Sequence, residues 1–302
     1  RAAATKTKIK IPAEAFDWYD AYAHGMMDRR EFMDRLGSIA VGGLTVAMLT
    51  STLIPNYAIA QQVSFNDKDI KATYEKFPSL MGHGEGNGYL VQPSAPSSGG
   101  KRPTVLVIHE NRGLNPYIKD VARRLAKAGY AAFAPDALYP LGGYPGNDDD
   151  GRSMQSSLDP SKVEFDFIAA THFLKDHTIS NGKLGVVGFC FGGYISNFLA
   201  ASLPNVVDAA VPFYGTPART DIVNNVSGPL LIQLAEIDPR VNASWPAYEA
   251  TLKTNRASYK MHMYSGARHG FHNDSTGRYD EKMAEIAWRR TLDFFAINLR
   301  SI

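Results

Sequence analysis

The sequence of 302 residues contains a single cysteine, Cys190, and therefore lacks the second thiol that an internal disulfide needs. It equally lacks the several cysteines of a zinc ribbon or an iron–sulfur cluster. Neither sign of charge is in excess, because 32 Lys and Arg residues stand against 30 Asp and Glu residues. No basic stripe interleaved with aromatic residues is present, so the sequence does not indicate a nucleic-acid-binding protein. Cys190 is then either a small buried apolar residue or a reactive group.

Internal repeats of 20–50 residues are also missing, and the composition, 44% hydrophobic and 21% charged, is that of an ordinary globular protein. The length allows one large domain or two small ones. Residues 1–62 differ in character from the rest of the chain. We therefore divide the chain into an N-terminal extension, residues 1–62, and a main domain, residues 63–302.

The extension contains a stretch of eighteen residues without a charge, 37–54, which follows Arg29-Arg30 and precedes the small-x-small triplet 58–60. This order resembles a twin-arginine export signal, although the lead before the arginine pair is long. It predicts a periplasmic protein if the signal is used. One alternative is a membrane anchor, for which Gly, Ser and Thr make the stretch poorly suited. The other is a retained helix that packs on its own domain or forms a homo-oligomer contact, in which case the protein stays in the cytoplasm.

From residue 104 onward, short apolar runs alternate with longer helical patterns. The run 104–108 is β-branched and fully apolar, as a strand buried on both faces requires. The alternation predicts an α/β fold with a mostly parallel twisted sheet and helices on both faces, in which active sites lie at the carboxyl ends of the strands. The glycine-rich segment 82–88 lacks the Lys-Ser/Thr of a phosphate-binding loop and is expected to be a turn. The predicted strands are 104–108, 131–134, 184–187, 207–213, 229–234 and 260–264, and the predicted helices are 115–128, 161–177, 194–203, 243–255 and 280–299.

Cys190 lies in the sequence GFCFGG, residues 188–193, directly after a predicted strand and before a predicted helix. This is the cysteine form of the nucleophile elbow, a sharp turn that exposes the central side chain above the sheet. The flanking glycines are needed because neighbouring backbones come close there. The amides at the start of the helix favour a thiolate and a developing oxyanion. This context favours a nucleophile over a buried structural cysteine.

A thiol nucleophile needs a base, and the base needs a group that orients it. Asp238 follows the predicted strand 229–234, and His269 follows the predicted strand 260–264. Nucleophile, acid and histidine thus occur in the order expected for this fold. The sequence therefore predicts the catalytic triad Cys190, Asp238 and His269. Glu236 is the rival acid and His272 the rival base.

These motifs resemble the dienelactone hydrolase (carboxymethylenebutenolidase) family of α/β hydrolases over roughly residues 83–300. The stretches that carry the resemblance are VIHENRGL at 107–114, APDALY at 134–139, GFCFGG at 188–193, FYG at 213–215 and GARHGF at 266–271. The resemblance implies a hydrolase that cleaves a carboxylic ester or lactone through a thioester acyl-enzyme. It also implies that Glu110 contacts the thiol in the resting enzyme and that the backbone N–H groups of Asn111 and Phe191 form the oxyanion hole.

Substrate choice is where the chain departs from the family pattern. The resemblance implies arginines that hold a substrate carboxylate, one of them four residues after the catalytic histidine, but this position is Asn273. The loop after Tyr139 carries three acids in a row, and Arg152 is either a substitute for the missing arginine or a solvated charge. We therefore expect a neutral or differently charged ester or lactone. The residues predicted to line the substrate pocket are Tyr139, Arg152, Tyr214, Phe271, His272 and Asn273.

No cofactor is expected, and the spacing of His83, His172, His177, His269 and His272 does not indicate a metal site. His109 could orient the loop that carries Glu110 or simply pack in the core. The rival hypothesis for function is a non-catalytic α/β-hydrolase scaffold that serves as a binding or assembly protein. Acyl transfer in place of hydrolysis would use the same residues.

Overall fold

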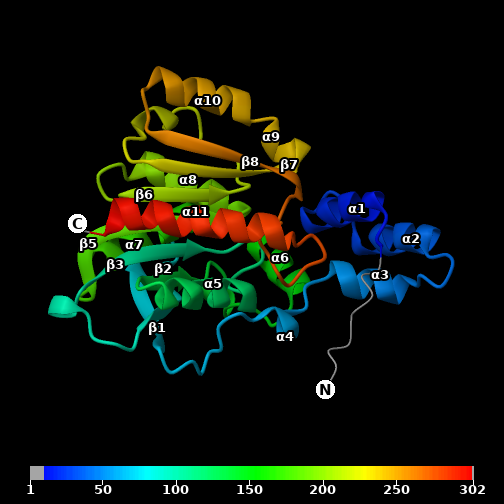
Figure 1. Cartoon of the computed structure of the whole chain (residues 1–302), viewed down its shortest axis with the longest axis horizontal. Coiled ribbons are helices and arrows are strands. Elements are labelled where there is room, and N and C mark those ends of the chain that lie inside the picture. Colours follow the sequence, from blue (N-terminus) through cyan, green and yellow to red (C-terminus); the bar gives the residue numbers. More distant parts are fainter. Residues whose placement is uncertain (1–9, 301–302) are drawn as a thin grey trace.

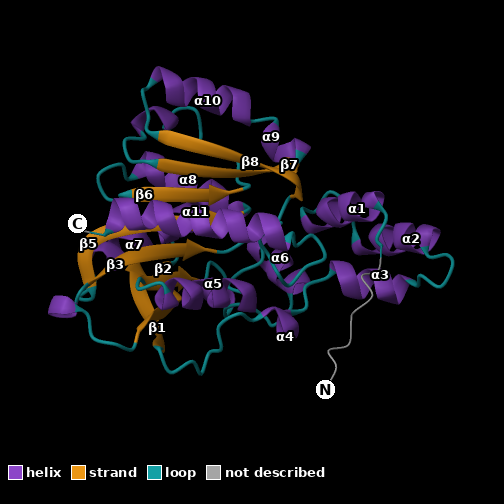
Figure 2. Ribbon diagram, viewed as in Figure 1, coloured by secondary structure: helices purple, strands orange, loops and turns teal. Residues whose placement is uncertain are grey.

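The computed structural model describes residues 10–300 of the chain. Its centre is an eight-stranded sheet with the strand order β1-β2-β4-β3-β5-β6-β7-β8 (Figures 1 and 2). Strands β3 to β8 run parallel, whereas β1 and β2 are antiparallel to their neighbours. The strands are β1 (Ile70–Ser79), β2 (Gly84–Pro93), β3 (Arg102–Ile108), β4 (Ala131–Pro135), β5 (Ser180–Phe189), β6 (Ala209–Phe213), β7 (Leu230–Ile237) and β8 (Tyr259–Arg268).

Helices cover both faces of this sheet, as the alternating pattern predicted. Along β3, Val105 and Val107 pack into one core with α5 and α11, while Leu106 and Ile108 pack into the other with α7, α8 and α10. This alternation follows from the two-residue period of a strand. The helices are α1 (Ala13–Ala23), α2 (Arg29–Ile39), α3 (Val46–Leu53), α4 (Tyr57–Ala60), α5 (Pro116–Lys127), α6 (Asp148–Ser156), α7 (Pro160–Asp176), α8 (Phe191–Ser202), α9 (Pro239–Asn242), α10 (Trp245–Thr254) and α11 (Glu281–Leu299).

The segment 82–88 was expected to be a turn, and this expectation is wrong for most of it. Residues from Gly84 onward belong to β2, which pairs with β1 and β4. A Cβ at Gly86 would lie 2.1 Å from the Phe77 ring, so glycine makes room here for an aromatic side chain of the neighbouring strand. Gly86 and Gly88, which faces the Phe133 ring in the same way, therefore indicate close packing and not a loop.

Helices α1 to α3 of the extension pack around a small core of their own, and the short helix α4 follows them. Tyr22 stacks on Phe32 with ring centroids 4.8 Å apart, and Leu36, Leu49 and Leu53 are fully buried. Arg29 and Arg30 begin α2, and the uncharged stretch 37–54 is divided between the end of α2 and α3. Within residues 10–300, no helix is both long and apolar enough to cross a membrane. Figure 1 places α1 to α3 beyond the arrowheads of the strands, which is the edge where active sites form.

Candidate active site

Cys190 lies in a strained turn between β5 and α8. Its φ of 58° and ψ of −113° are rare for a residue with a side chain. The turn is enforced by close backbone contacts, since a Cβ at Gly188 would lie 1.8 Å from the carbonyl oxygen of Gly192. The predicted elbow is thus present in its geometry, with the sulfur at the carboxyl edge of the sheet.

The elbow makes a prediction for stability. A Cβ at Gly192 would lie 2.2 Å from the carbonyl oxygen of Ile108, a backbone atom that cannot move aside. We expect Gly192→Ala to lower the free energy of unfolding by about 3 kcal/mol or more. The matched control is Gly37→Ala in α2, where the nearest atom is 3.9 Å away and alanine should stabilise the helix. Urea denaturation measures both, and a loss below about 1 kcal/mol at Gly192 would contradict the geometry.

Asp238 and His269 are in direct contact. Asp238 follows β7 and caps α9, and its Oδ2 lies 2.6 Å from Nδ1 of His269, directly after β8. Both side chains are buried. The alternative acid and the alternative base have other partners. Glu236 accepts from the backbone N–H of Gly266 at 2.6 Å, and Nδ1 of His272 lies 2.5 Å from the Tyr117 hydroxyl. The geometry therefore favours Asp238 and His269 as the acid and the base.

The other ring nitrogen of His269, Nε2, is buried and has no hydrogen-bond partner among the described residues. A ring nitrogen of His269 lies within 4.8 Å of the Cys190 sulfur. Burial alone would raise the pKa of the thiol, but the charges of His269 and His24 outweigh burial and lower this pKa to about 5. Burial likewise opposes the charged form of His269, whereas the thiolate and Asp238 raise its pKa to about 10. The arrangement favours a thiolate beside an imidazolium.

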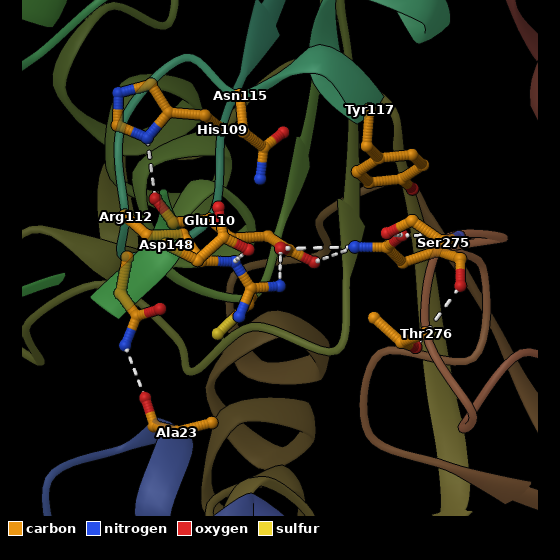
Figure 3. A network of polar contacts seen from close by, with 12 residues as sticks. Ala23, His109, Glu110, Arg112, Asn115, Tyr117, Asp148, Ser275 and Thr276 are labelled. Atoms are coloured by element: carbon orange, nitrogen blue, oxygen red, sulfur yellow. Dashed lines mark hydrogen bonds and ion pairs between the residues drawn. The ribbon is translucent and has the colours of Figure 1, made fainter. Parts of the chain in front are cut away.

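Glu110 does not contact the thiol, which corrects the expectation drawn from the resemblance. It forms an ion pair with Arg112 and accepts from the side-chain amide of Asn273 at 3.3 Å (Figure 3). Arg112 is itself buried and pairs with Asp148 at 3.2 Å. A buried guanidinium requires carboxylate partners, so Arg112 holds Glu110 in this network and away from the sulfur.

The neighbouring loop instead contacts the extension. The side-chain amide of Asn111 donates to the carbonyl oxygen of Ala23 at 3.0 Å, a contact drawn in Figure 3 at the labelled Ala23. Behind this loop, His109 is fully buried, and its Nε2 accepts from the backbone N–H of Ala137 at 3.1 Å. The ring of His109 therefore ties the loop after β3 to the segment after β4.

A cavity of about 470 Å³ is lined by Phe191, which directly follows Cys190 in the chain, and by His24, whose Nε2 lies 3.4 Å from the Cys190 sulfur. This size suits a small organic substrate. Asn111 and Phe191, whose backbone N–H groups were predicted to form the oxyanion hole, both line it. The amide of Phe191 is the first of α8, where no preceding turn supplies an acceptor. The remaining lining residues are His24, Gly25, Asp149, Arg152, Ser153, Gln155, Ser156, Leu158, Pro160 and Val163.

Of the six residues predicted to line the substrate pocket, Arg152 lines this cavity. Its guanidinium lies over the Tyr22 ring, 4.8 Å from the centroid, and pairs with Asp149 at 3.4 Å. The three acids at 148–150, which were expected in a loop, form the first turn of α6, where negative charge is favoured by the helix dipole. Tyr214 lies behind His269 with ring centroids 5.0 Å apart.

The other four predicted pocket residues lie outside the cavity lining. The hydroxyl of Tyr139 donates to Glu85 of β2 at 2.7 Å. Phe271 and His272 are buried among aromatic side chains below the sheet edge, and Asn273 is held by Glu110. Because Phe271, His272 and Asn273 follow His269 closely in the sequence, they were expected near the substrate. The tight turn at 269–273 instead directs their side chains into the core.

His24 is a site residue that the sequence did not reveal. It follows α1 in the extension, and its Nε2 lies 3.4 Å from the sulfur of Cys190, 166 positions away along the chain. Its ring centroid is 4.9 Å from that of His269. No motif surrounds His24, and the only local signal is Asp20 at the i−4 position.

His24, Cys190 and His269 are also the only group of three metal-ligand side chains that lie close together in the described part of the chain, with ligand atoms within 4.8 Å of one another. The contacts already formed account for them as acid–base partners, and we assign no metal to them. His83 pairs with Asp166 at 2.6 Å and His177 with Glu75 at 2.8 Å, so each belongs to an ion pair with a carboxylate. His172 lies on α7 and lines a different pocket, with Pro78, Phe173 and His177.

Comparison with known proteins identifies the family of the main domain. The model of the Dienelactone hydrolase family matches residues 87–299, and a YqhI-like model matches residues 3–41. The chain is 59% identical to the "Putative hydrolase fragment YghX" of Escherichia coli strain K12 over 39% of its own length and 99% of that protein. It is 35% identical to a "Putative carboxymethylenebutenolidase" of Aquifex aeolicus over 70% of its own length and 94% of the relative.

Among solved structures, a "Putative Dienelactone Hydrolase" from Klebsiella pneumoniae is 26% identical to the chain. It superposes with a TM-score of 0.64 over 75% of this chain and 98% of that one. The matched family region begins within β2 and includes Cys190, Asp238 and His269, whereas His24 lies in the YqhI-like region. The chain therefore belongs to the dienelactone hydrolase family, has an α/β-hydrolase fold, and is a hydrolase of the carboxymethylenebutenolidase type.

Proposed function

We propose that the protein hydrolyses a carboxylic ester or lactone with Cys190 as nucleophile, His269 as acid and base, and Asp238 as the group that orients His269. The observation that carries the proposal is the pair formed by Asp238 and His269 at 2.6 Å, with Nε2 of His269 unpartnered among the described residues and a ring nitrogen of His269 within 4.8 Å of the sulfur on the strained elbow. Such an arrangement has the order and the contacts of a nucleophile, base and orienter.

The reaction follows from these positions. The thiolate attacks the substrate carbonyl carbon, and the oxyanion is held by the backbone N–H groups of Asn111 and Phe191, each donor contributing about 3 kcal/mol. His269 then gives its proton to the leaving oxygen, and the C–O bond breaks to leave a thioester on Cys190. Water next attacks the thioester while His269 takes its proton. The thiolate leaves, and the acid product and the starting enzyme are formed.

The cavity supports a neutral acyl group. Leu158, Pro160, Val163 and Phe191 give it apolar walls, and its arginine is already paired with Asp149 and packed on Tyr22. A paired guanidinium gains little from a second carboxylate, and Asn273 stands outside the cavity.

We therefore predict a preference for neutral esters. Two matched aryl esters, one neutral and one with a carboxylate on the acyl chain, should differ in kcat/KM by about 10-fold or more in favour of the neutral ester. Steady-state assays with both substrates, and with an added alcohol to detect acyl transfer, measure this. A clear preference for the carboxylate would contradict the neutral pocket, and absence of turnover with every ester and lactone would favour a binding scaffold.

A further inference from the structure

Two histidines, each paired with an aspartate, have a ring nitrogen within 4.8 Å of the Cys190 sulfur, and Nε2 of His24 contacts the sulfur at 3.4 Å. His269 is held by Asp238 from the main domain. His24 is held in the same manner by Asp20, because its Nδ1 lies 2.7 Å from the carbonyl oxygen and 3.3 Å from Oδ1 of that residue. Both acceptors face one nitrogen, so Nδ1 of His24 carries a proton and Nε2 is the nitrogen that faces the sulfur.

We propose that His24 of the extension is a second catalytic histidine, which shares the proton of the Cys190 thiol and, together with His269, maintains a thiolate in the resting enzyme. The inference rests on the proposed function and extends it. The step is a proton transfer alone, from the sulfur of Cys190 to Nε2 of an imidazole, and it leaves one thiolate and one imidazolium. Every later step of ester cleavage then begins from a nucleophile that is already charged.

His24 thus makes the contact with the thiol that the family resemblance assigned to Glu110. A carboxylate against the sulfur would oppose a thiolate, and substrate would have to displace it. In this structure Arg112 and Asn273 hold Glu110, and the nearest partner of the sulfur is His24 at 3.4 Å. Once Nε2 has taken the thiol proton, the imidazolium at that distance stabilises the thiolate by donating a hydrogen bond and by its charge.

Some neighbours of His24 raise the pKa of its ring and others lower it. Burial opposes the protonated ring, but the thiolate and Asp20 outweigh burial and raise the pKa of His24. The guanidinium of Arg240 donates to Nε2 of His24 at 2.9 Å and opposes a positive ring, so protonation of Nε2 requires this contact to break; the Arg240 side chain is exposed. Asp20 is also paired with Arg278 at 3.3 Å, which fixes its position. The titratable and charged groups that surround the two residues are Asp20, Asp149, Arg152, Tyr214, Asp238, Arg240, His269 and Arg278.

The extension is therefore part of the site and not a separate appendage. Ala23 receives the hydrogen bond from Asn111, and Arg268 pairs with Asp17 at 2.7 Å. His24 and Gly25 line the substrate cavity. These contacts hold the extension on the main domain and place His24 next to the elbow. A chain without α1 would therefore have a different thiol environment.

The test titrates the thiol without any ester. The rate of alkylation by iodoacetamide is measured from about pH 4 to about pH 9 for the full chain, for His24→Gln and for His24→Ala. Loss of the imidazole should raise the apparent pKa of the thiol by about 1–3 units, as expected for removing a charge in contact. Alkylation at pH 6 should then fall by at least about 2-fold, while the rates converge toward about pH 9, where the thiolate is nearly complete in all variants.

The matched control is His262→Gln on β8, whose ring lies near Tyr264 and makes no contact with Cys190. Its titration should equal that of the unaltered chain. The inference is overturned if either His24 variant titrates like the unaltered chain, if ester turnover increases at every pH on removing His24, or if EDTA changes the titration, since a bound metal would then explain the low pKa. Ester turnover measured separately distinguishes the two proposals: a His24-dependent titration without turnover refutes only the proposed function.

Discussion

Replacing Cys190 by alanine should lower kcat for a short-chain aryl ester by at least about 10⁴-fold, because no other side chain can form the acyl intermediate. Cys190 lies at the strained elbow, and ring nitrogens of His24 and His269 lie within 4.8 Å of its sulfur. Stopped assays at high enzyme concentration can measure the residual rate.

The control for this variant is Cys190→Ser, which keeps the shape of the side chain. Its hydroxyl has a far higher pKa than a thiol and would not ionise beside His269. We expect both variants to unfold at the temperature of the unaltered chain and both to lose turnover. Turnover that survives Cys190→Ala at more than about one tenth of the original rate would assign the nucleophile to another residue.

The second large effect concerns Asp238. We expect Asp238→Asn to lower kcat by about 10⁴-fold with little change in the fold, because asparagine can donate to Nδ1 of His269 and so favours the wrong tautomer. In the unaltered chain Oδ2 of Asp238 accepts from that nitrogen at 2.6 Å. Steady-state kinetics over a range of pH measures the loss.

Glu236→Gln is the matched control, since Glu236 is the other carboxylate at the end of β7. Its side chain accepts from the backbone N–H of Gly266 and does not reach His269. Neutralising it should change kcat less than about 3-fold. Equal losses in the two variants would mean that Asp238 acts through the stability of the loop and not through the tautomer of His269.

The site residues that directly follow a strand could be predicted from the sequence. GFCFGG must form a sharp strand-to-helix turn, because the glycines at 188 and 192 face backbone atoms closer than any Cβ allows. Asp238 and His269 each follow a strand of a parallel sheet, and the carboxyl ends of such strands share one edge. The order of these residues along the chain was therefore enough to bring them together.

What the sequence could not show depends on contacts across long separations. His24 meets Cys190 because three helices of the extension pack beyond the strand ends, and nothing near His24 marks that docking. The pairing of Glu110 with Arg112 follows from the burial of the guanidinium, which only the assembled loop reveals. Glycines in β2 suggested a turn because the aromatic rings that fill their space come from other strands.

Two expectations about the extension stay predictions. Export through the twin-arginine pathway would place the protein in the periplasm, and a role of the extension in a homo-oligomer would need a second copy. In the structure the extension packs against its own main domain, where Arg29 pairs with Asp149 at 2.7 Å and Tyr57 bonds Asp148 at 2.5 Å. Both acids belong to α6, whose residues also line the cavity, so these two contacts join the extension to the cavity wall.

The most direct test of a cysteine-based hydrolase is to trap the acyl-enzyme. The protein is mixed with an excess of a neutral aryl ester, quenched in acid within the first turnovers, digested, and analysed by mass spectrometry. A cysteine nucleophile predicts one acyl group on the peptide that contains Cys190, absent after Cys190→Ala and removed by hydroxylamine, as a thioester requires. An acyl group on any other residue, or turnover with an unmodified Cys190 peptide at every quench time, would contradict it.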